Sequence, residues 1–205
     1  MNEKFFDLKK EKQDRMINAS LKIFALHGYR HASTDDIVRE ASISKGLLFH
    51  YFGSKLGTYH FVFDYSVRYM SLELKTAVNP GEKNLFEILR QAEYGKMTAM
   101  RRYPYMQQFL NESMHEDVSE ALLSVEAKRN ELSALYEKIL SQADLSRIPA
   151  SIDPQKLIRL IDYTVKGLMT SRFQDSSFQA EMLYAEIKDY IDLIEKMTEN
   201  CRIQL

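Results

Sequence analysis

Apolar positions recur with helical spacing along most of the chain, and this pattern predicts an all-α fold. In residues 15–27, Ile17, Leu21 and Phe24 fall at positions i, i+4 and i+7, on one face of a helix. Gly28 follows, and a residue without Cβ takes positive φ at little cost. We therefore expect the first helix to end at Gly28.

Two short helices separated by a tight corner are predicted next. Ser33 is a hydroxyl N-cap for a helix over residues 34–41, which opens with two acidic residues that favour the helix dipole. Ser42 and Ile43 then precede Ser44, a second N-cap in front of an apolar run at 47–49. Short helices across such a corner form a helix-turn-helix.

Helical periodicity also continues through the remainder of the chain. Further helices are predicted at residues 56–77, 85–100, 105–113, 118–139, 154–173 and 182–197. The fold class is therefore all-α, with about nine helices and no convincing strand. We divide the chain into a helix-turn-helix domain, residues 1–55, and a second helical domain, residues 56–205.

Composition limits the compartment and the class of partner that we expect for this protein. The 205 residues include one cysteine, Cys201, which excludes an internal disulfide framework and favours a reducing compartment. We find neither a cleaved secretory signal nor a run of 18 apolar residues, so we expect a cytoplasmic protein without a membrane segment. Residues 1–55 carry 10 Lys and Arg against 7 Asp and Glu, a small excess that permits an anionic partner without identifying one.

The start of the predicted third helix carries the side chains expected to meet DNA. The amino-terminal end of a recognition helix enters the major groove, where Lys45 can donate to guanine or phosphate and Leu47 can pack on a thymine methyl. Each residue alone also fits a plainer role as a cap, a solvated charge or a core aromatic. The set at this spacing favours binding to double-stranded DNA through Ser33, Ser44, Lys45, Gly46, Leu47, His50, Tyr51 and Lys55.

The stretch from Arg15 to Lys55 resembles the DNA-binding domain of TetR-family transcriptional regulators. The resemblance lies in Gly28-Tyr29, in the run Ala41-Ser42-Ile43-Ser44-Lys45-Gly46, and in Tyr51-Phe52. It implies a homodimer on a palindromic operator, usually a repressor, released when a small molecule binds a second domain that also dimerises. Phe49 stands where a tyrosine is common, and Ser42 replaces a common glycine. A positive φ at Ser42 would cost about 1 kcal/mol.

Residues 56–205 are rich in large, adaptable side chains that suit an apolar pocket. Such side chains are also typical of a core, and Glu93 is a possible polar contact, although a place on a solvated face is the commoner expectation for it. We expect a small apolar or amphipathic effector, of unknown identity, to be bound by Tyr94, Met97, Met100, Phe109, Tyr136, Tyr163 and Met169.

The two last helices are apolar on more than one side, so they must be covered on more than one side. We expect them to pair across a two-fold axis in a homodimer; the alternative is burial within one subunit. The interface residues on this interpretation are Ile161, Val165, Leu168, Ile187, Ile191 and Ile194.

No convergent catalytic or metal-binding set is found in the sequence. His27 and His31 are separated by the helix-breaking Gly28, and His115-Glu116-Asp117 fits a helix start with acids at the positive end of the dipole. We therefore expect no enzyme, cofactor or metal. Two other functions stay open, namely a nucleoid or division factor whose second domain binds a protein, and a helical enzyme with a vestigial DNA-binding module.

Overall fold

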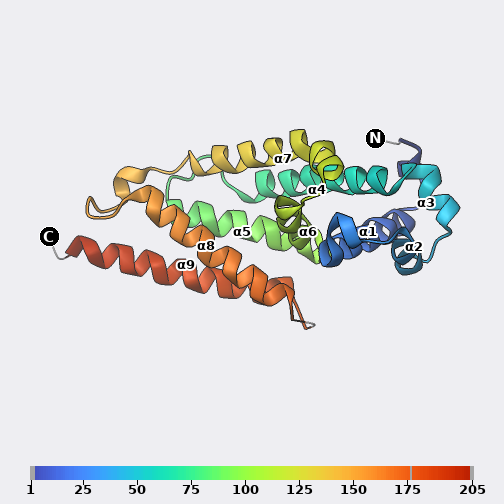
Figure 1. Cartoon of the computed structure of the whole chain (residues 1–205). Coiled ribbons are helices and arrows are strands. Elements are labelled where there is room, and N and C mark those ends of the chain that lie inside the picture. The colour runs from blue at the N-terminus through green and yellow to red at the C-terminus, as the bar shows by residue number, and fades with distance from the viewer. Residues whose placement is uncertain (1–2, 176, 204–205) are drawn as a thin grey trace. The chain divides into compact units, whose positions relative to one another are not determined.

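The computed structural model describes residues 3–175 and 177–203, and Figure 1 shows its helices in order along the chain. These residues form nine α-helices and no strand, which confirms the predicted all-α fold. The helices are α1 (Lys10–His31), α2 (Thr34–Ala41), α3 (Lys45–Phe52), α4 (Lys55–Ala77), α5 (Leu85–Arg102), α6 (Met106–Glu112), α7 (Ser119–Leu140), α8 (Pro154–Phe173) and α9 (Ala180–Ile203). Three short 3-10 helices accompany them: η1 (Glu3–Asp7), η2 (Ser113–His115) and η3 (Leu145–Arg147).

Gly28 interrupts the first helix at the predicted position. Its φ of 63° and ψ of 176° lie outside helical geometry, and the last turn of α1 continues to His31 beyond this kink. The residue without Cβ supplies the left-handed φ that other residues adopt only at a cost. The chain thus leaves the axis of α1 just before α2 begins.

The helices form two compact units. The first unit contains residues 1–70 and 102–133, and the second contains residues 71–101 and 134–205. Helices α4 and α7 each contribute residues to both units. This division follows the packing of the helices. The predicted boundary between a helix-turn-helix domain, residues 1–55, and a second domain, residues 56–205, is a division by function and stays a prediction.

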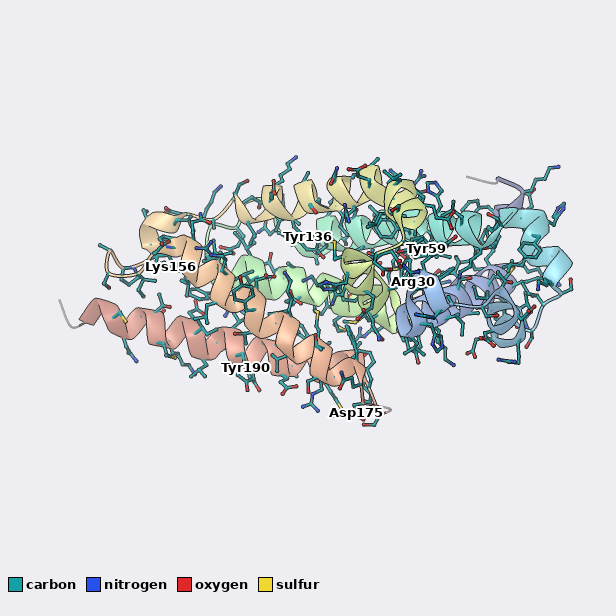
Figure 2. All side chains as sticks on the ribbon, viewed as in Figure 1. Arg30, Tyr59, Tyr136, Lys156, Asp175 and Tyr190 are labelled. Carbon is teal, nitrogen blue, oxygen red and sulfur yellow. The ribbon has the colours of Figure 1, made fainter. Side chains whose placement is uncertain are left out.

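Aromatic side chains fill the core of the first unit. The rings of Phe24 on α1, Tyr59 on α4 and Phe109 on α6 have centroids 5.0 to 6.1 Å apart. All three side chains are buried, and Tyr59 is labelled in Figure 2. These ring contacts join α1, α4 and α6 in the core of the first unit.

The core of the second unit is built mainly from α5, α8 and α9. A buried apolar cluster contains Leu85, Phe86, Met97, Met100, Leu157, Ile161, Val165, Met169, Ala180, Leu183, Ile187 and Ile191. At its edge, Arg90 of α5 pairs with Asp192 at 2.8 Å and with Glu195 at 2.7 Å, both on α9. The ion pairs connect α5 to α9 beside the apolar cluster.

Candidate nucleic-acid interface

The helix-turn-helix is set by the capping residues that the sequence predicted. The hydroxyl of Ser33 accepts a hydrogen bond from the amide of Asp35 at 3.1 Å, and that of Ser44 accepts from the amide of Leu47 at 3.2 Å. Between the two helices, Ser42 takes the left-handed conformation with φ of 52°. Its amide donates to the carbonyl of Arg39, and the amide of Ile43 donates to that of Val38 at 3.0 Å. These bonds satisfy the end of α2 and turn the chain into α3.

The amino-terminal end of α3 is open to solvent. Ser44, Lys45 and Gly46 are exposed, and Leu47 is half-buried. Further along α3, His50 is exposed and Tyr51 is half-buried, with ring centroids 5.0 Å apart. The structure therefore brings together the α3 residues that the sequence predicted for DNA contact. Their contacts with DNA stay a prediction.

Lys45 is paired with an acid of the preceding helix. Its Nζ lies 2.8 Å from Oδ1 of Asp35 near the start of α2, and both side chains are at least half exposed. An exposed ion pair contributes about 0–1 kcal/mol, so it does not hold Lys45 firmly. The lysine can exchange this partner for a phosphate or a base edge.

Lys55 lies against the protein rather than in open solvent. Its Nζ donates to the carbonyl of Arg30 at 3.2 Å and sits 4.6 Å from the centre of the Tyr29 ring. Burial lowers the pKa of this ammonium, while Glu116 and Glu120 oppose the shift. An ammonium has three donors, so a phosphate contact remains compatible with this placement.

Gly57 is a residue of the site that the sequence analysis missed. It lies in the first turn of α4, and a Cβ built there would come within 1.9 Å of the carbonyl oxygen of Phe52, the last residue of α3. Only glycine allows this close approach. The absence of a side chain at Gly57 therefore lets α4 approach the end of α3, and this signal depends on a contact between two helices.

Comparisons with known proteins agree on the family of this domain and on the fold of the chain. The family model described as bacterial regulatory proteins, tetR family, matches residues 16–57. The HTH-type transcriptional regulator SrpR of Pseudomonas putida is 22% identical over 190 residues, which cover 91% of this chain and 86% of SrpR. A TetR family transcriptional regulator from Chloroflexus aurantiacus J-10-FL has a TM-score of 0.66 at 20% identity, covering 95% of this chain and 96% of its own. The regulator PfmR from Thermus thermophilus has a TM-score of 0.58 at 19% identity, covering 88% and 96%.

Residues 16–57 match the DNA-binding domain of TetR-family transcriptional regulators, and the whole chain is similar in sequence and fold to such regulators. TetR regulators bind DNA and are not enzymes, so these similarities support both predictions. Among the described residues, no group of three or more His, Cys, Asp or Glu side chains could hold a metal ion. No helix in the described ranges has both the length and the apolar character needed to cross a membrane.

Six of the seven predicted effector residues lie in three kinds of place. Met97, Met100 and Met169 belong to the buried cluster of the second unit. Tyr94 and Tyr163 are exposed, the latter by 67%. Phe109 lies in the first unit, where its ring packs on Phe24, Tyr59 and Phe63, so its plainer role as a core residue holds. A recess of about 130 Å³ in the second unit has a different lining: Asn84, Leu85, Phe86, Asp144, Arg147, Ile148, Pro149, Glu195, Thr198 and Glu199.

Tyr136 lies beside a largely buried ion pair on α5. Glu93 and Lys96 are joined at 2.6 Å, with side chains only 7% and 14% exposed, and Lys96 Nζ is 5.1 Å from the centre of the Tyr136 ring. Burial alone would lower the pKa of Lys96, but the charge of Glu93 outweighs it and raises the pKa. Glu93 therefore lies in the interior, whereas a solvated face was the commoner expectation.

Four of the six predicted dimer residues are buried within the chain itself. Ile161, Val165, Ile187 and Ile191 are buried in the second core, and Leu168 and Ile194 pack against it partly buried. Burial within one subunit, the alternative, accounts for the four buried side chains, whereas a place of Leu168 and Ile194 in an interface stays a prediction. The reason is that α8 and α9 pack on each other and share a buried apolar cluster with α5, which leaves other side chains of α8 and α9 exposed.

Proposed function

We propose that this protein is a homodimeric TetR-type repressor that binds a palindromic operator in the cytoplasm and is released by a small effector. The observation that carries the proposal is the exposed amino-terminal end of α3, where Ser44, Lys45 and Gly46 face solvent. A helix end with free amides and a lysine suits the major groove, and two such ends related by a two-fold axis suit a palindrome.

The side chains around this end have distinct proposed roles. Lys45 and Leu47 read base edges, because their positions on the first turn of α3 bring them deepest into the groove. Ser33, His50, Tyr51 and Lys55 hold the phosphates on either side, and such contacts fix the register of the protein without reading sequence.

Selection of duplexes from a random-sequence pool by the full chain tests the DNA-reading proposal. Lys45→Ala should weaken binding to the selected duplex by about 1–3 kcal/mol, with a smaller effect on a random duplex of the same length. Lys156→Ala, which removes an exposed lysine of α8, is the matched control. If the Lys45 variant and the wild type bind the selected duplex with equal affinity, α3 does not read the DNA sequence.

For the dimer we propose the outward faces of α8 and α9. Leu160 and Tyr163 are exposed on α8 at 54% and 67%, and Gly167, one turn on, has open space where a Cβ would stand. On α9, Tyr190, Leu193 and Met197 are exposed at positions i, i+3 and i+7. Two apolar stripes on adjacent helices suit an isologous four-helix interface.

Sedimentation of the variant Leu160→Glu, Tyr163→Glu tests this interface. We expect a folded monomer, because two carboxylates would be buried without partners at a cost of several kcal/mol per dimer. Leu123→Glu, which changes an exposed leucine of α7, should leave the dimer intact. A double variant that still sediments as a dimer would place the interface elsewhere.

For the effector we propose a small apolar or amphipathic molecule bound in the second unit near Met97, Met100 and Met169. Thioether side chains repack readily around a ligand. Tyr136 and the Glu93–Lys96 pair would supply polar contacts from within the unit. Helix α4 starts beside the recognition helix and its residues 71–77 belong to the second unit, so a tilt of α4 would move α3.

A thermal-shift screen of apolar and amphipathic compounds, followed by DNA binding with every stabiliser, tests the effector. A ligand that prefers the non-binding state about 100-fold shifts the equilibrium by about 2.7 kcal/mol per site, which is enough to release a selected duplex. Stabilisers that never change DNA affinity would favour the alternative, a second domain that binds a protein.

A further inference from the structure

The segment before α1 places a buried phenylalanine against the end of the recognition helix. Phe5, in η1, has no exposed surface. The centroid of its ring lies 5.8 Å from that of Tyr51 and 5.4 Å from that of Phe52, both in the last turn of α3. It also lies 4.8 Å from the ring of Phe61 on α4. Phe5 therefore joins the recognition helix to α4.

The position of Phe5 is fixed by α1. The side-chain amide of Gln13 donates to the carbonyl of Phe6 at 3.0 Å and to that of Leu8 at 2.7 Å, and Gln13 is itself buried. The amide of Leu8 in turn donates to the carbonyl of Phe5 at 3.3 Å. A buried amide that satisfies two carbonyls holds the segment in one conformation. Phe5 thus has a defined place behind α3.

The recognition helix needs such a support. Among the eight residues of α3, Leu48 is the buried one, while Tyr51 and Phe52 are half-buried. A helix of about two turns with one fully buried side chain has few packing contacts that oppose rocking about that side chain. Rocking about Leu48 would move Lys45 and Leu47 at the exposed end. Ring contacts from Phe5 at the other end oppose this motion.

We propose that Phe5 is a positioning residue for DNA reading, which fixes the tilt of α3 about Leu48 and thereby the placement of Lys45 and Leu47. The inference rests on the proposed function, in which α3 reads the operator. Base contacts demand exact placement of donors, whereas phosphate contacts tolerate small shifts. Loss of Phe5 should therefore reduce discrimination between sequences more than it reduces general affinity for DNA.

The test compares two duplexes at one salt concentration with the full chain: the duplex that the wild type selects from a random pool, and a random duplex of equal length. Phe5→Ala should weaken binding to the selected duplex about tenfold or more and leave the random duplex within about twofold. Phe5→Leu, which keeps an apolar side chain, should restore part of the ratio. Phe6→Ala is the matched control, because Phe6 is adjacent and 42% exposed, and it should keep the wild-type ratio.

A purely structural role predicts a different result. If Phe5 only stabilises the fold, Phe5→Ala has a lower melting temperature, but well below that temperature it keeps the wild-type ratio of affinities for the selected and the random duplex. This result would overturn the inference. If Phe5→Ala does not fold, Gln13→Ala and Phe5→Leu take its place. A reduced ratio in either variant supports the inference, and a wild-type ratio in both overturns it.

The same measurements separate this inference from the proposed function. If Lys45→Ala lowers the ratio and the Phe5 variants do not, DNA reading by α3 stands and only the role of Phe5 falls. If Lys45→Ala has no effect, or if the wild type enriches no duplex from the pool, both proposals fall.

Discussion

The backbone amide of Tyr29 donates a hydrogen bond of 2.9 Å to Oε2 of Glu116. The other oxygen of this carboxylate accepts from the amides of Asp117 and Val118 at 3.2 and 3.0 Å, just before α7. Gly28 leaves helical geometry immediately before Tyr29, which frees the Tyr29 amide for an acceptor outside α1. One carboxylate thus accepts hydrogen bonds from an amide in the last turn of α1 and from two amides just before α7.

Side chains strengthen this contact within the first unit. The hydroxyl of Tyr29 donates to Glu120 at 2.7 Å, and Arg30, labelled in Figure 2, pairs with Asp117 at 3.1 Å. Burial, together with the bond to Glu120, raises the pKa of Tyr29 to about 12. The last turn of α1, which leads into the helix-turn-helix, is therefore held by acids at the start of α7.

Replacing Glu116 should destabilise the protein measurably. Glu116→Ala removes the acceptor of a partly buried amide of α1 and of the two amides just before α7, so the free energy of unfolding should fall by about 1–3 kcal/mol. Urea unfolding followed by circular dichroism measures it. Glu126→Ala, at an exposed position of α7, should change it by less than about 0.5 kcal/mol. Equal losses in the two variants would contradict a specific role for Glu116.

The helices and turns of the helix-turn-helix were predictable because their sequence signals are local. Ser33 and Ser44 cap the helices that directly follow them, and Gly28 and Ser42 adopt the positive φ expected from their places in the pattern. Each of these features depends on residues within one turn of the chain, which a sequence displays directly.

Features that depend on distant partners could not be predicted. Glu116 was interpreted as an acid on a helix dipole, because nothing near it in sequence points to Tyr29. Periodicity showed that α8 is apolar on several sides, but it does not show which side packs within the same chain. Ile161 was therefore assigned to the dimer interface, although its side chain is buried within the chain. The sequence around Phe5 shows only an apolar dipeptide, Phe5-Phe6, in a charged segment, and this pattern does not indicate which helix the ring contacts.

Gly57 should not tolerate even the smallest side chain. In Gly57→Ala the new Cβ would meet the carbonyl of Phe52 at 1.9 Å, so the end of α3 must move. We expect a loss of about 1–3 kcal/mol in unfolding free energy and a weaker preference for the selected duplex. Gly46→Ala, where no atom lies within 4 Å of the added Cβ, should match or exceed the wild type in stability. Wild-type stability in Gly57→Ala would contradict the close approach.

Removing Asp35 should strengthen DNA binding. Asp35→Asn keeps the size of the side chain but releases Lys45 from its 2.8 Å partner and removes a negative charge beside the proposed phosphate path. We expect an affinity gain of about 1 kcal/mol for selected and random duplexes alike, and a salt dependence steeper by about one ion. Asp162→Asn, which breaks the exposed pair with Lys166 on α8, makes the same charge change as a control. A gain of equal size in the control would assign the effect to net charge alone.

Asp14 should make the stability of the protein depend on pH in the acid range. Burial alone would raise the pKa of Asp14, but hydrogen bonds from Tyr103 at 2.8 Å, Lys10 at 3.1 Å and Arg102 at 2.6 Å outweigh it and lower the pKa below its ordinary value of 3.8. The unfolded chain then binds the proton more tightly than the folded chain. The stability that Asp14 contributes is therefore present above about pH 4 and is lost as the pH falls through its lowered pKa.

Urea unfolding between neutral pH and the acid range measures this contribution. Asp14→Asn should cost about 1–3 kcal/mol at neutral pH, because charge-assisted bonds from three donors are lost or weakened. The difference between the variant and the wild type should then shrink as the pH falls below about 4. Asp189→Asn, at an exposed position of α9, should keep the acid-range slope of the wild type. A constant difference between Asp14→Asn and the wild type at every pH would mean that packing of the side chain, rather than its charge, stabilises the fold.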